Sequence, residues 1–440
     1  MSNNKTVSVG SLSQRDTITG MVIIAFMFFM FGFTSWINAI LIPYFKISFE
    51  LSHVQSYLVT FAFYISYLLF SVPASYLLKS VGFKKGMMVG FWVMSCGAFL
   101  FVPAAITMTY ELFLLGLFSI GAGLALLQTA ANPYITILGP KERAAQRFSI
   151  MGICNKGAGI LAPLLFAAVI FKATDSAMLD NVANLSQAER DVVFHELIQR
   201  VIVPYACVGT FLFLIGLFIR YSPLPEIDTE HESDELAEAN SSKTSITQFP
   251  HLILGAIAIF LHVGTQVISI DTVISYAATM NLNLIEAKVF PSYTLTAQIC
   301  AYFVGIFFIP KFFSQLTALK VSMIFGIILT LLIVFVKKEV TFLGHTTDIS
   351  IWFVVMLGLA NSLVWAGVWP LALDGLGRFT KIGASIMVMG LAGNAILPLI
   401  YGYFVDIWDA RNAYWVLFPC YAYLVFYAFR GYRLRSWKSA

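Results

Sequence analysis

Charge is what this sequence has least of. Lys, Arg, Asp and Glu together make up 11% of its 440 residues, and hydrophobic residues make up 59%. A soluble domain carries about 25% charged residues because its surface faces water. A chain with less than half of that share cannot cover itself in water, so lipid must contact much of its surface. The formal net charge of +4 is also too small to indicate nucleic acid as a partner.

Cysteine is scarce as well, and catalytic motifs are missing. The five cysteines lie inside apolar runs, without the spacing of a metal or redox site, at positions 96, 154, 207, 300 and 420. We therefore interpret them as small core residues. The sequence contains no H-E-x-x-H, G-x-S-x-G or Walker-type phosphate loop. We predict that the protein is not an enzyme or an ATP-driven pump, and that it uses no metal or other cofactor.

Long apolar runs are abundant. Twelve runs have about the 20 residues that cross a bilayer as a helix, near residues 20–43, 56–78, 86–107, 111–138, 148–171, 201–221, 251–277, 289–313, 318–336, 349–375, 382–405 and 412–432. The first run is too long for the apolar part of a signal peptide, so we expect it to be retained. Barrel strands would be shorter and would alternate apolar with polar residues. The predicted fold class is all-α integral membrane, with twelve transmembrane helices.

The distribution of Lys and Arg predicts the orientation of these helices. With both termini in the cytoplasm, eighteen of the 27 basic residues fall in cytoplasmic segments and eight in outer ones. Cytoplasmic loops of membrane proteins carry such an excess. The remaining basic residue, Lys156, lies inside a helix.

Internal repetition indicates two related six-helix halves. The segment from Gly32 to Tyr44 and the segment from Gly264 to Tyr276 share their Gly and Tyr at a constant offset of 232 residues. Helices four and ten each contain a proline near the cytoplasmic end, Pro133 and Pro370. Paired repeats of this kind, with a binding site near the membrane midplane, are typical of transporters.

Two polar inserts complete the predicted organisation. Residues 174–196 lie between helices five and six, outside the membrane, and could hold a short amphipathic helix. Residues 222–248 contain an acidic run and are interpreted as a solvated cytoplasmic linker. The chain then divides into a cytoplasmic tail, a first bundle, the linker, a second bundle and a second cytoplasmic tail, at residues 1–19, 20–221, 222–248, 249–432 and 433–440.

Several segments carry a family resemblance. They read N-A-I-L-I-P-Y-F from Asn38, L-Q-T-A-A-N-P-Y-I-T-I-L-G-P from Leu127, C-N-K-G-A-G-I-L-A-P from Cys154, T-K-I-G-A-S from Thr380 and A-G-N-A-I-L-P-L-I-Y-G from Ala392. Together they resemble the major facilitator superfamily, and within it the fucose:proton symporter family with its glucose/galactose and N-acetylglucosamine permeases. The resemblance implies a monosaccharide importer, functional as a monomer in a bacterial inner membrane. Two acidic residues of the fucose type fall here on Ala39 and Gln128, which cannot ionise.

Two charged residues lie inside predicted transmembrane helices, where a charge is unfavourable without a partner or a function. A charge at the bilayer centre costs about 3 kcal/mol on insertion scales. Asp271 lies within helix seven, at the repeat equivalent of Ala39, so we assign it to cation coupling; the alternative is a structural ion pair or cap. Lys156, in helix five, is the second coupling candidate if it lines the cavity. Alternatively, its long stem snorkels to the cytoplasmic interface. The spacing leaves a direct contact between the two charges open.

Neutral polar side chains are the predicted sugar-binding residues. Amides offer donors and acceptors to hydroxyl groups, and indole rings could stack on a pyranose. The candidates are Gln128, Asn132, Asn155, Asn38, Gln266, Asn394, Trp365 and Trp369. The alternative for each amide is a role in joining helices, and for each tryptophan a place at the membrane interface.

The leading hypothesis is therefore a secondary transporter that imports a hexose or N-acetylglucosamine by symport with a proton or Na⁺. Its partners are the sugar, the cation and the lipid bilayer. A uniporter or sensor, in which Asp271 is only structural, is the first alternative. An export permease for another small solute is the second. The residues do not distinguish between the sugars or between the two cations.

Overall fold

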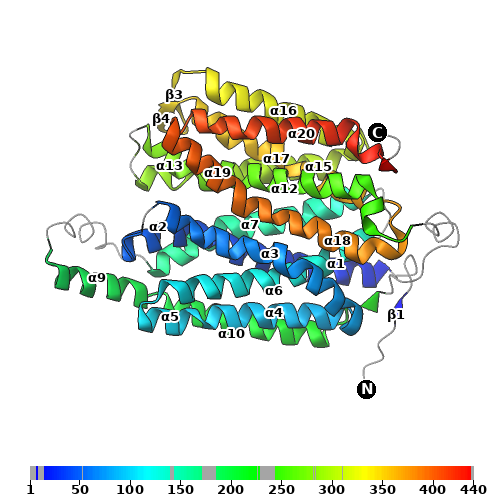
Figure 1. Cartoon of the computed structure of the whole chain (residues 1–440), viewed down its shortest axis with the longest axis horizontal. Coiled ribbons are helices and arrows are strands. Elements are labelled where there is room, and N and C mark those ends of the chain that lie inside the picture. Colours follow the sequence, from blue (N-terminus) through cyan, green and yellow to red (C-terminus); the bar gives the residue numbers. More distant parts are fainter. Residues whose placement is uncertain are drawn as a thin grey trace.

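The computed structural model describes residues 6–7, 14–51, 53–138, 143–170, 185–224, 226–227, 243–280, 282, 284–309 and 311–437. Almost all of this part of the chain is helical (Figure 1). In lipid, helices satisfy every backbone hydrogen bond within one segment, which is why long apolar runs fold this way. The twelve predicted runs are confirmed as helical, each falling on one helix or on consecutive helices.

The first six predicted runs form one bundle, here called the N-terminal half. Its helices are α1 (Gln14–Trp36), α2 (Asn38–Ser48), α3 (His53–Val81), α4 (Phe83–Phe99), α5 (Phe101–Thr107), α6 (Tyr110–Ile137), α7 (Ala144–Ile170), α9 (Gln187–Gln199) and α10 (Ile202–Tyr221). A short parallel pairing joins β1 (Thr6–Val7) to β2 (Glu226–Ile227).

The remaining runs form the C-terminal half, which lies above the first in Figure 1. Its helices are α12 (Pro250–Asp271), α13 (Val273–Ala278), α14 (Leu284–Ala287), α15 (Phe290–Phe308), α16 (Gln315–Phe335), α17 (Ser350–Leu373), α18 (Thr380–Met389), α19 (Gly393–Ile407) and α20 (Leu417–Phe429). Single 3₁₀ turns are η3 (Ile246–Gln248), η4 (Gly377–Phe379), η5 (Gly390–Ala392), η6 (Asn412–Val416) and η7 (Gly431–Arg433). Strands β3 (Glu339–Phe342) and β4 (His345–Asp348) form a hairpin before α17.

Ten helical segments in the described residues are long and apolar enough to cross a membrane. The other two predicted crossings correspond to α15 and to η6 with α20, which are helical but shorter. Helix α1 begins and α20 ends at the same end of the bundle (Figure 1). We call this the termini end, and the opposite end the far end.

Two helices break at related places in the two halves. Helix α1 stops at Trp36 and α2 resumes at Asn38, while α12 stops at Asp271 and α13 resumes at Val273. With the 232-residue offset of the repeat, the two breaks lie within a few residues of each other. Broken helices of this kind leave backbone ends inside a membrane protein, where they can bind ions and polar solutes.

A glycine contact sets the position of α7 against α1. A Cβ atom on Gly32 would lie 2.0 Å from the backbone oxygen of Asn155, so only glycine permits this approach. Close helix packing through small residues is common in membranes, where apolar side chains gain little from burial. The contact fixes Asn155 beside the first helix.

The structure corrects the prediction for three cysteines and shows a helix in the polar insert. Cys96, Cys207 and Cys300 are exposed rather than buried in the core, which fits side chains on the lipid-facing surface of apolar helices. The polar insert predicted at 174–196 does contain the start of a helix, α9, whose Phe194 and Leu197 are buried. Residues 171–184, and most of the predicted acidic linker, lie outside the described residues.

Candidate functional site

A cavity of about 110 Å³ lies between the two halves. The N-terminal half lines it with side chains of α1, α6 and α7, namely Phe28, Phe31, Gln128, Phe148, Gly152, Asn155 and Lys156. The C-terminal half lines it from α12, α15, α17, η5 and α19, with Val263, Gln266, Tyr302, Trp365, Ala366, Leu391 and Asn394. Six of the predicted site residues therefore share one cavity.

Lys156 is the charged group of this lining. Its side chain is only 5% exposed, and its Nζ donates a hydrogen bond to Oε1 of Gln266, 3.3 Å away in the other half. The same Nζ lies 4.4 Å from the centre of the Trp36 ring. The ammonium group thus faces the cavity and the interface between the halves. The alternative of a lysine that snorkels to the membrane surface is wrong for this conformation.

A chain of amides continues from Lys156 into the C-terminal half. Gln266 donates from Nε2 to Oε1 of Gln298 in α15, over 3.3 Å. Gln298 is fully buried, and its own Nε2 has no hydrogen-bond partner among the described residues. A buried amide donor without a partner is costly unless water or a solute satisfies it. The chain therefore offers an open donor at its end.

Asn155 and Gln128 supply amides from the N-terminal half. Asn155 accepts a hydrogen bond from Nε1 of Trp36 at 3.4 Å, and donates to the backbone oxygen of Phe28 at 3.3 Å. Gln128 donates from Nε2 to the hydroxyl of Tyr67 at 3.3 Å. These contacts orient both amides at the wall of the cavity and leave further donor and acceptor capacity for a solute.

The two predicted tryptophans of α17 differ in position. Trp365 lines the cavity, whereas Trp369 is fully buried behind it. Their rings stack with centroids 5.0 Å apart and an angle of 20° between planes. Trp369 therefore supports the cavity-facing indole from behind and does not face the solute space.

Asn394, Asn132 and Asn38 complete the predicted amides. Asn394 lines the cavity directly after the 3₁₀ turn η5, and its Oδ1 has no partner among the described residues. Asn132 is fully buried one helical turn along α6 from Gln128, outside the lining. Asn38 begins α2, and its side chain lies outside the described residues.

Asp271 does not line the cavity. It is the last residue of α12, at the helix break, and is partly buried. Its carboxylate interacts electrostatically with the Lys156 ammonium and with the hydroxyl of Tyr64, but among the described residues it forms no direct ion pair with the lysine. The end of a helix carries partial negative charge, an unfavourable neighbour for a bare carboxylate and a favourable one for a bound cation.

Helix α7 also packs directly against α15 on the termini side of the cavity. Gln146 donates from Nε2 to the backbone oxygens of Ile306 and Ile309, at 3.1 and 2.6 Å. Further along the helix, a Cβ on Gly152 would lie 2.5 Å from the Tyr302 ring. The cavity is thus closed toward the termini end by close contacts between the halves. Its volume is well below the roughly 300 Å³ of small ligand pockets, so it must widen to admit a solute.

The family model described as Major Facilitator Superfamily matches residues 24–395. The chain belongs to this superfamily. It is 31% identical over 432 residues to a glucose/galactose transporter of Brucella abortus, covering 97% of this chain and 98% of that protein. It is 28% identical over 427 residues to the L-fucose-proton symporter of Escherichia coli, covering 96% and 94%.

A solved structure agrees with this assignment. The superfamily transporter FucP in its outward conformation matches with a TM-score of 0.77 at 26% identity, covering 96% of this chain and 100% of that one. The predicted resemblance and fold class are therefore confirmed, and so is the prediction that the protein is a transporter rather than an enzyme.

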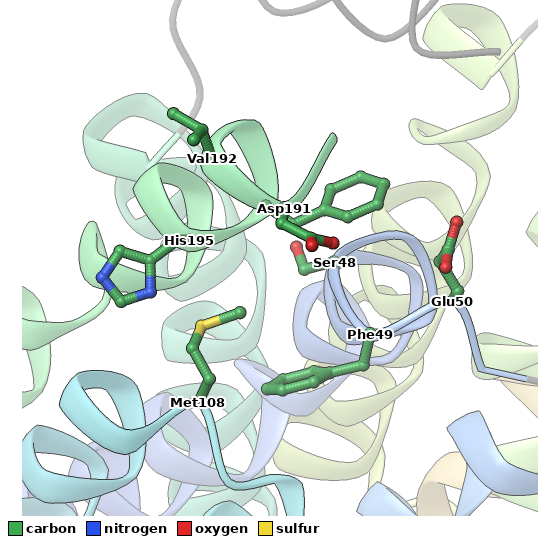
Figure 2. A pocket seen from close by; sticks show the side chains of 8 residues that line it. Ser48, Phe49, Glu50, Met108, Asp191, Val192 and His195 are labelled. Carbon is green, nitrogen blue, oxygen red and sulfur yellow. The ribbon is translucent and has the colours of Figure 1, made fainter. Parts of the chain in front are cut away.

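A larger pocket lies at the far end, within the N-terminal half. It measures about 550 Å³ and lies between α9, the end of α2 and the residue after α5, as Figure 2 shows. Its lining includes Glu50, Asp191 and His195, yet the described residues contain no metal-binding cluster of three such side chains. All of its residues belong to the N-terminal half, whereas a superfamily transporter carries its solute between halves.

Sequence reasoning missed the aromatic part of the lining. Phe28, Phe31, Phe148 and Tyr302 face the cavity of this transporter, but they lie in apolar helices among forty phenylalanines and nineteen tyrosines of the chain. Gln298 was also missed, although a lone amide in an apolar helix is the signal that identified Gln266. The same rule applied to helix eight would have found it.

Proposed function

We propose that the protein is a secondary transporter that carries a monosaccharide together with a cation by alternating access. The observation that carries the proposal is the cavity between the halves, where amides, a lysine and an indole converge from both bundles. Amides bind hydroxyl groups as donors and acceptors, and an indole face covers the apolar face of a pyranose.

The names of the relatives support a sugar as the solute. The Brucella abortus protein is named a glucose/galactose transporter and the Escherichia coli protein an L-fucose-proton symporter. We propose a hexose or N-acetylglucosamine as substrate. Within the cavity, Gln128, Asn155, Gln266 and Asn394 would bind its hydroxyls, and Trp365 its ring. Asn132 and Trp369 would support these contacts from outside the lining. Asn38 stays a proposed sugar-binding residue.

Asp271 is the proposed cation site, with Lys156 as its electrostatic partner. The carboxylate lies at the end of a broken helix, where a proton or Na⁺ is favoured. The positions that hold acids in the fucose type carry Ala39 and Gln128 here, so neither can take that role. A cation that neutralises Asp271 also changes its interaction with Lys156, which bonds to the cavity residue Gln266. This connects cation binding with the sugar site.

The proposed setting is a bacterial inner membrane, with both termini in the cytoplasm. The excess of Lys and Arg in the predicted cytoplasmic segments supports this orientation. The halves at 20–221 and 249–432 would rock about the cavity as two units joined by the linker at 222–248. We propose that one copy of the chain is sufficient, because the cavity is built from a single chain.

Uptake into reconstituted vesicles tests the proposal. Labelled glucose, galactose, fucose and N-acetylglucosamine would be offered with an imposed pH gradient, with a Na⁺ gradient, or with neither. We expect one sugar to accumulate against its gradient with one cation. Equilibration without accumulation under both gradients would indicate a uniporter. Failure to move any of the four sugars, in a preparation that binds none of them, would refute the proposal.

A further inference from the structure

A small apolar cluster separates the cavity from the far end. Trp36 of α1 packs with Ile270 of α12 and Leu295 of α15, and Ile160 of α7 lies against them. These four residues, here called the Trp36 cluster, are distinct from the main hydrophobic core. They come from both halves, so the cluster must come apart whenever the halves separate on the far side of the cavity.

Trp36 is held in this cluster by three specific contacts. Its Nε1 donates to Asn155, its ring faces the Lys156 ammonium at 4.4 Å, and Gly159 lies beneath it. A Cβ on Gly159 would approach the indole to 2.5 Å, so the ring occupies space that only glycine leaves open. All three partners belong to one face of α7. With Trp36 only 6% exposed, the indole has one well-defined position.

The cation that holds Trp36 is also part of the solute cavity. The ammonium of Lys156 contacts the ring and donates to Gln266, and both Lys156 and Gln266 line the cavity. A solute that accepts a hydrogen bond from the lysine competes with both contacts. Lys156 therefore contacts both the solute cavity and the Trp36 cluster.

We propose that Trp36 is the positioning residue of the far-side closure, and that the cation–π contact with Lys156 holds it closed. A solute or cation that draws the ammonium away from the ring releases the indole, and the Trp36 cluster then opens. The inference rests on the proposed function only in that the cavity opens toward the far end. It assigns to Trp36 a role in access, not in sugar stacking.

The test uses a cysteine reporter inside the cavity. Val263 lines the cavity and is 3% exposed, and cysteine replaces it with little change in volume. In a chain whose five native cysteines are replaced, a membrane-impermeant maleimide applied from the far side should label this reporter slowly. A desolvated cation–π contact contributes enough to keep the closed state favoured by about tenfold or more. Trp36→Leu and Lys156→Met should each raise the labelling rate by about that factor.

Two further variants separate this role from general structural damage. Lys156→Arg keeps a cation over the ring and should retain slow labelling, because guanidinium groups also stack on indoles. Trp352→Leu is the matched control. It removes a buried tryptophan near the far end whose ring partners Phe290, Tyr293 and Phe342 belong to the C-terminal half. Labelling of this control should stay at the parental rate.

The outcomes distinguish the inference from the proposed function. Labelling needs no sugar, so faster labelling of Trp36→Leu and Lys156→Met supports the inference even if none of the four sugars is carried. Unchanged labelling of both variants would overturn it, as would equal acceleration by Trp352→Leu. If Trp36→Leu does not fold, the comparison of Lys156→Met with Lys156→Arg still tests the inference, because both variants keep Trp36 and a long side chain at position 156, and only one of them keeps the cation over the ring.

Discussion

Lys156 and Gln266 join the two halves of the transporter by a hydrogen bond of 3.3 Å, from Nζ in α7 to Oε1 in α12. The bond lies at the wall of the cavity and crosses the interface that must open during transport. Because Lys156 is buried and Gln266 is half-buried, breaking the contact without a replacement partner would cost free energy.

Removing the charge of Lys156 should impair transport strongly. Lys156→Met keeps the length of the side chain but loses the ammonium, and with it the contacts to Gln266 and Trp36. We expect initial sugar uptake to fall about tenfold or more, the effect of losing one charge-assisted hydrogen bond in a dry site. The control is Lys79→Met, an exposed lysine at the end of α3, which should transport normally. Wild-type uptake by Lys156→Met would contradict a role in the cavity.

Asp271→Asn should separate accumulation from exchange. The amide keeps the shape of the side chain and loses its charge, so sugar should no longer accumulate with the cation gradient. Exchange of labelled for unlabelled sugar should persist, because Asp271 lies outside the cavity lining. Both are measured on one vesicle preparation. A purely structural carboxylate would make exchange, binding and accumulation decline together. Asp406→Asn, at an exposed carboxylate of α19 for which the described residues provide no ion pair, serves as the neutral control.

Gln128→Ala should weaken sugar binding without unfolding the protein. The change removes a donor and an acceptor from the cavity and leaves Tyr67 without its partner. We expect affinity to fall at least about fivefold, since each buried hydrogen bond to a solute contributes about 1 kcal/mol or more. Binding can be followed by calorimetry in detergent. Unchanged affinity would remove Gln128 from the site. Gln199→Ala, an exposed amide of α9, is the comparison variant.

Gly32→Ala should perturb the site through the backbone. The new methyl group would collide with the carbonyl oxygen of Asn155 and push α7 away from α1. We expect a loss of about 2 kcal/mol in stability from this overpacking, together with weaker sugar binding. Gly157 offers a matched control on α7, since a Cβ there has no atom within 4 Å. Gly157→Ala should leave the melting temperature unchanged or raise it. Equal effects of the two variants would exclude the proposed contact.

The ion pair between Asp348 and Arg411, at the far end, should stabilise the protein in a pH-dependent way. Asp348 pairs with Arg411 at 2.7 Å and accepts a hydrogen bond from the backbone of Ser350. Partial burial alone would raise the pKa of the Asp348 carboxyl, but these partners hold its pKa below the ordinary value. The stabilisation is thus complete above the ordinary aspartate pKa and is lost as the pH falls through the lowered one. Asp348→Asn should lower the melting temperature at neutral pH, and the difference from wild type should shrink at about pH 3.

Apolar runs were sufficient to locate the helices, since a membrane leaves the backbone few other conformations. They were not sufficient to orient side chains within them. Lys156 has the same place in the sequence whether it snorkels or lines a cavity, and only the approach of Gln266 and Trp36 decides. Tyr302 and Phe148 were not predicted because, in the sequence, an aromatic residue that faces a cavity cannot be distinguished from one that faces lipid. The site depends on how the two halves pack against each other, and this packing cannot be predicted from the pattern of apolar and polar residues in the sequence.

The amide chain that begins at Lys156 has a polarity. A protonated lysine can only donate, so it obliges Gln266 to present its oxygen, which turns the amide nitrogen of Gln266 toward the oxygen of Gln298. A neutral lysine could also accept, and both glutamines could then rotate by half a turn. The outward-facing atom of Gln298 would change from nitrogen to oxygen, from donor to acceptor. The loss of one proton from Lys156 of α7 would thereby change the free hydrogen-bonding group of Gln298, in α15, from a donor to an acceptor.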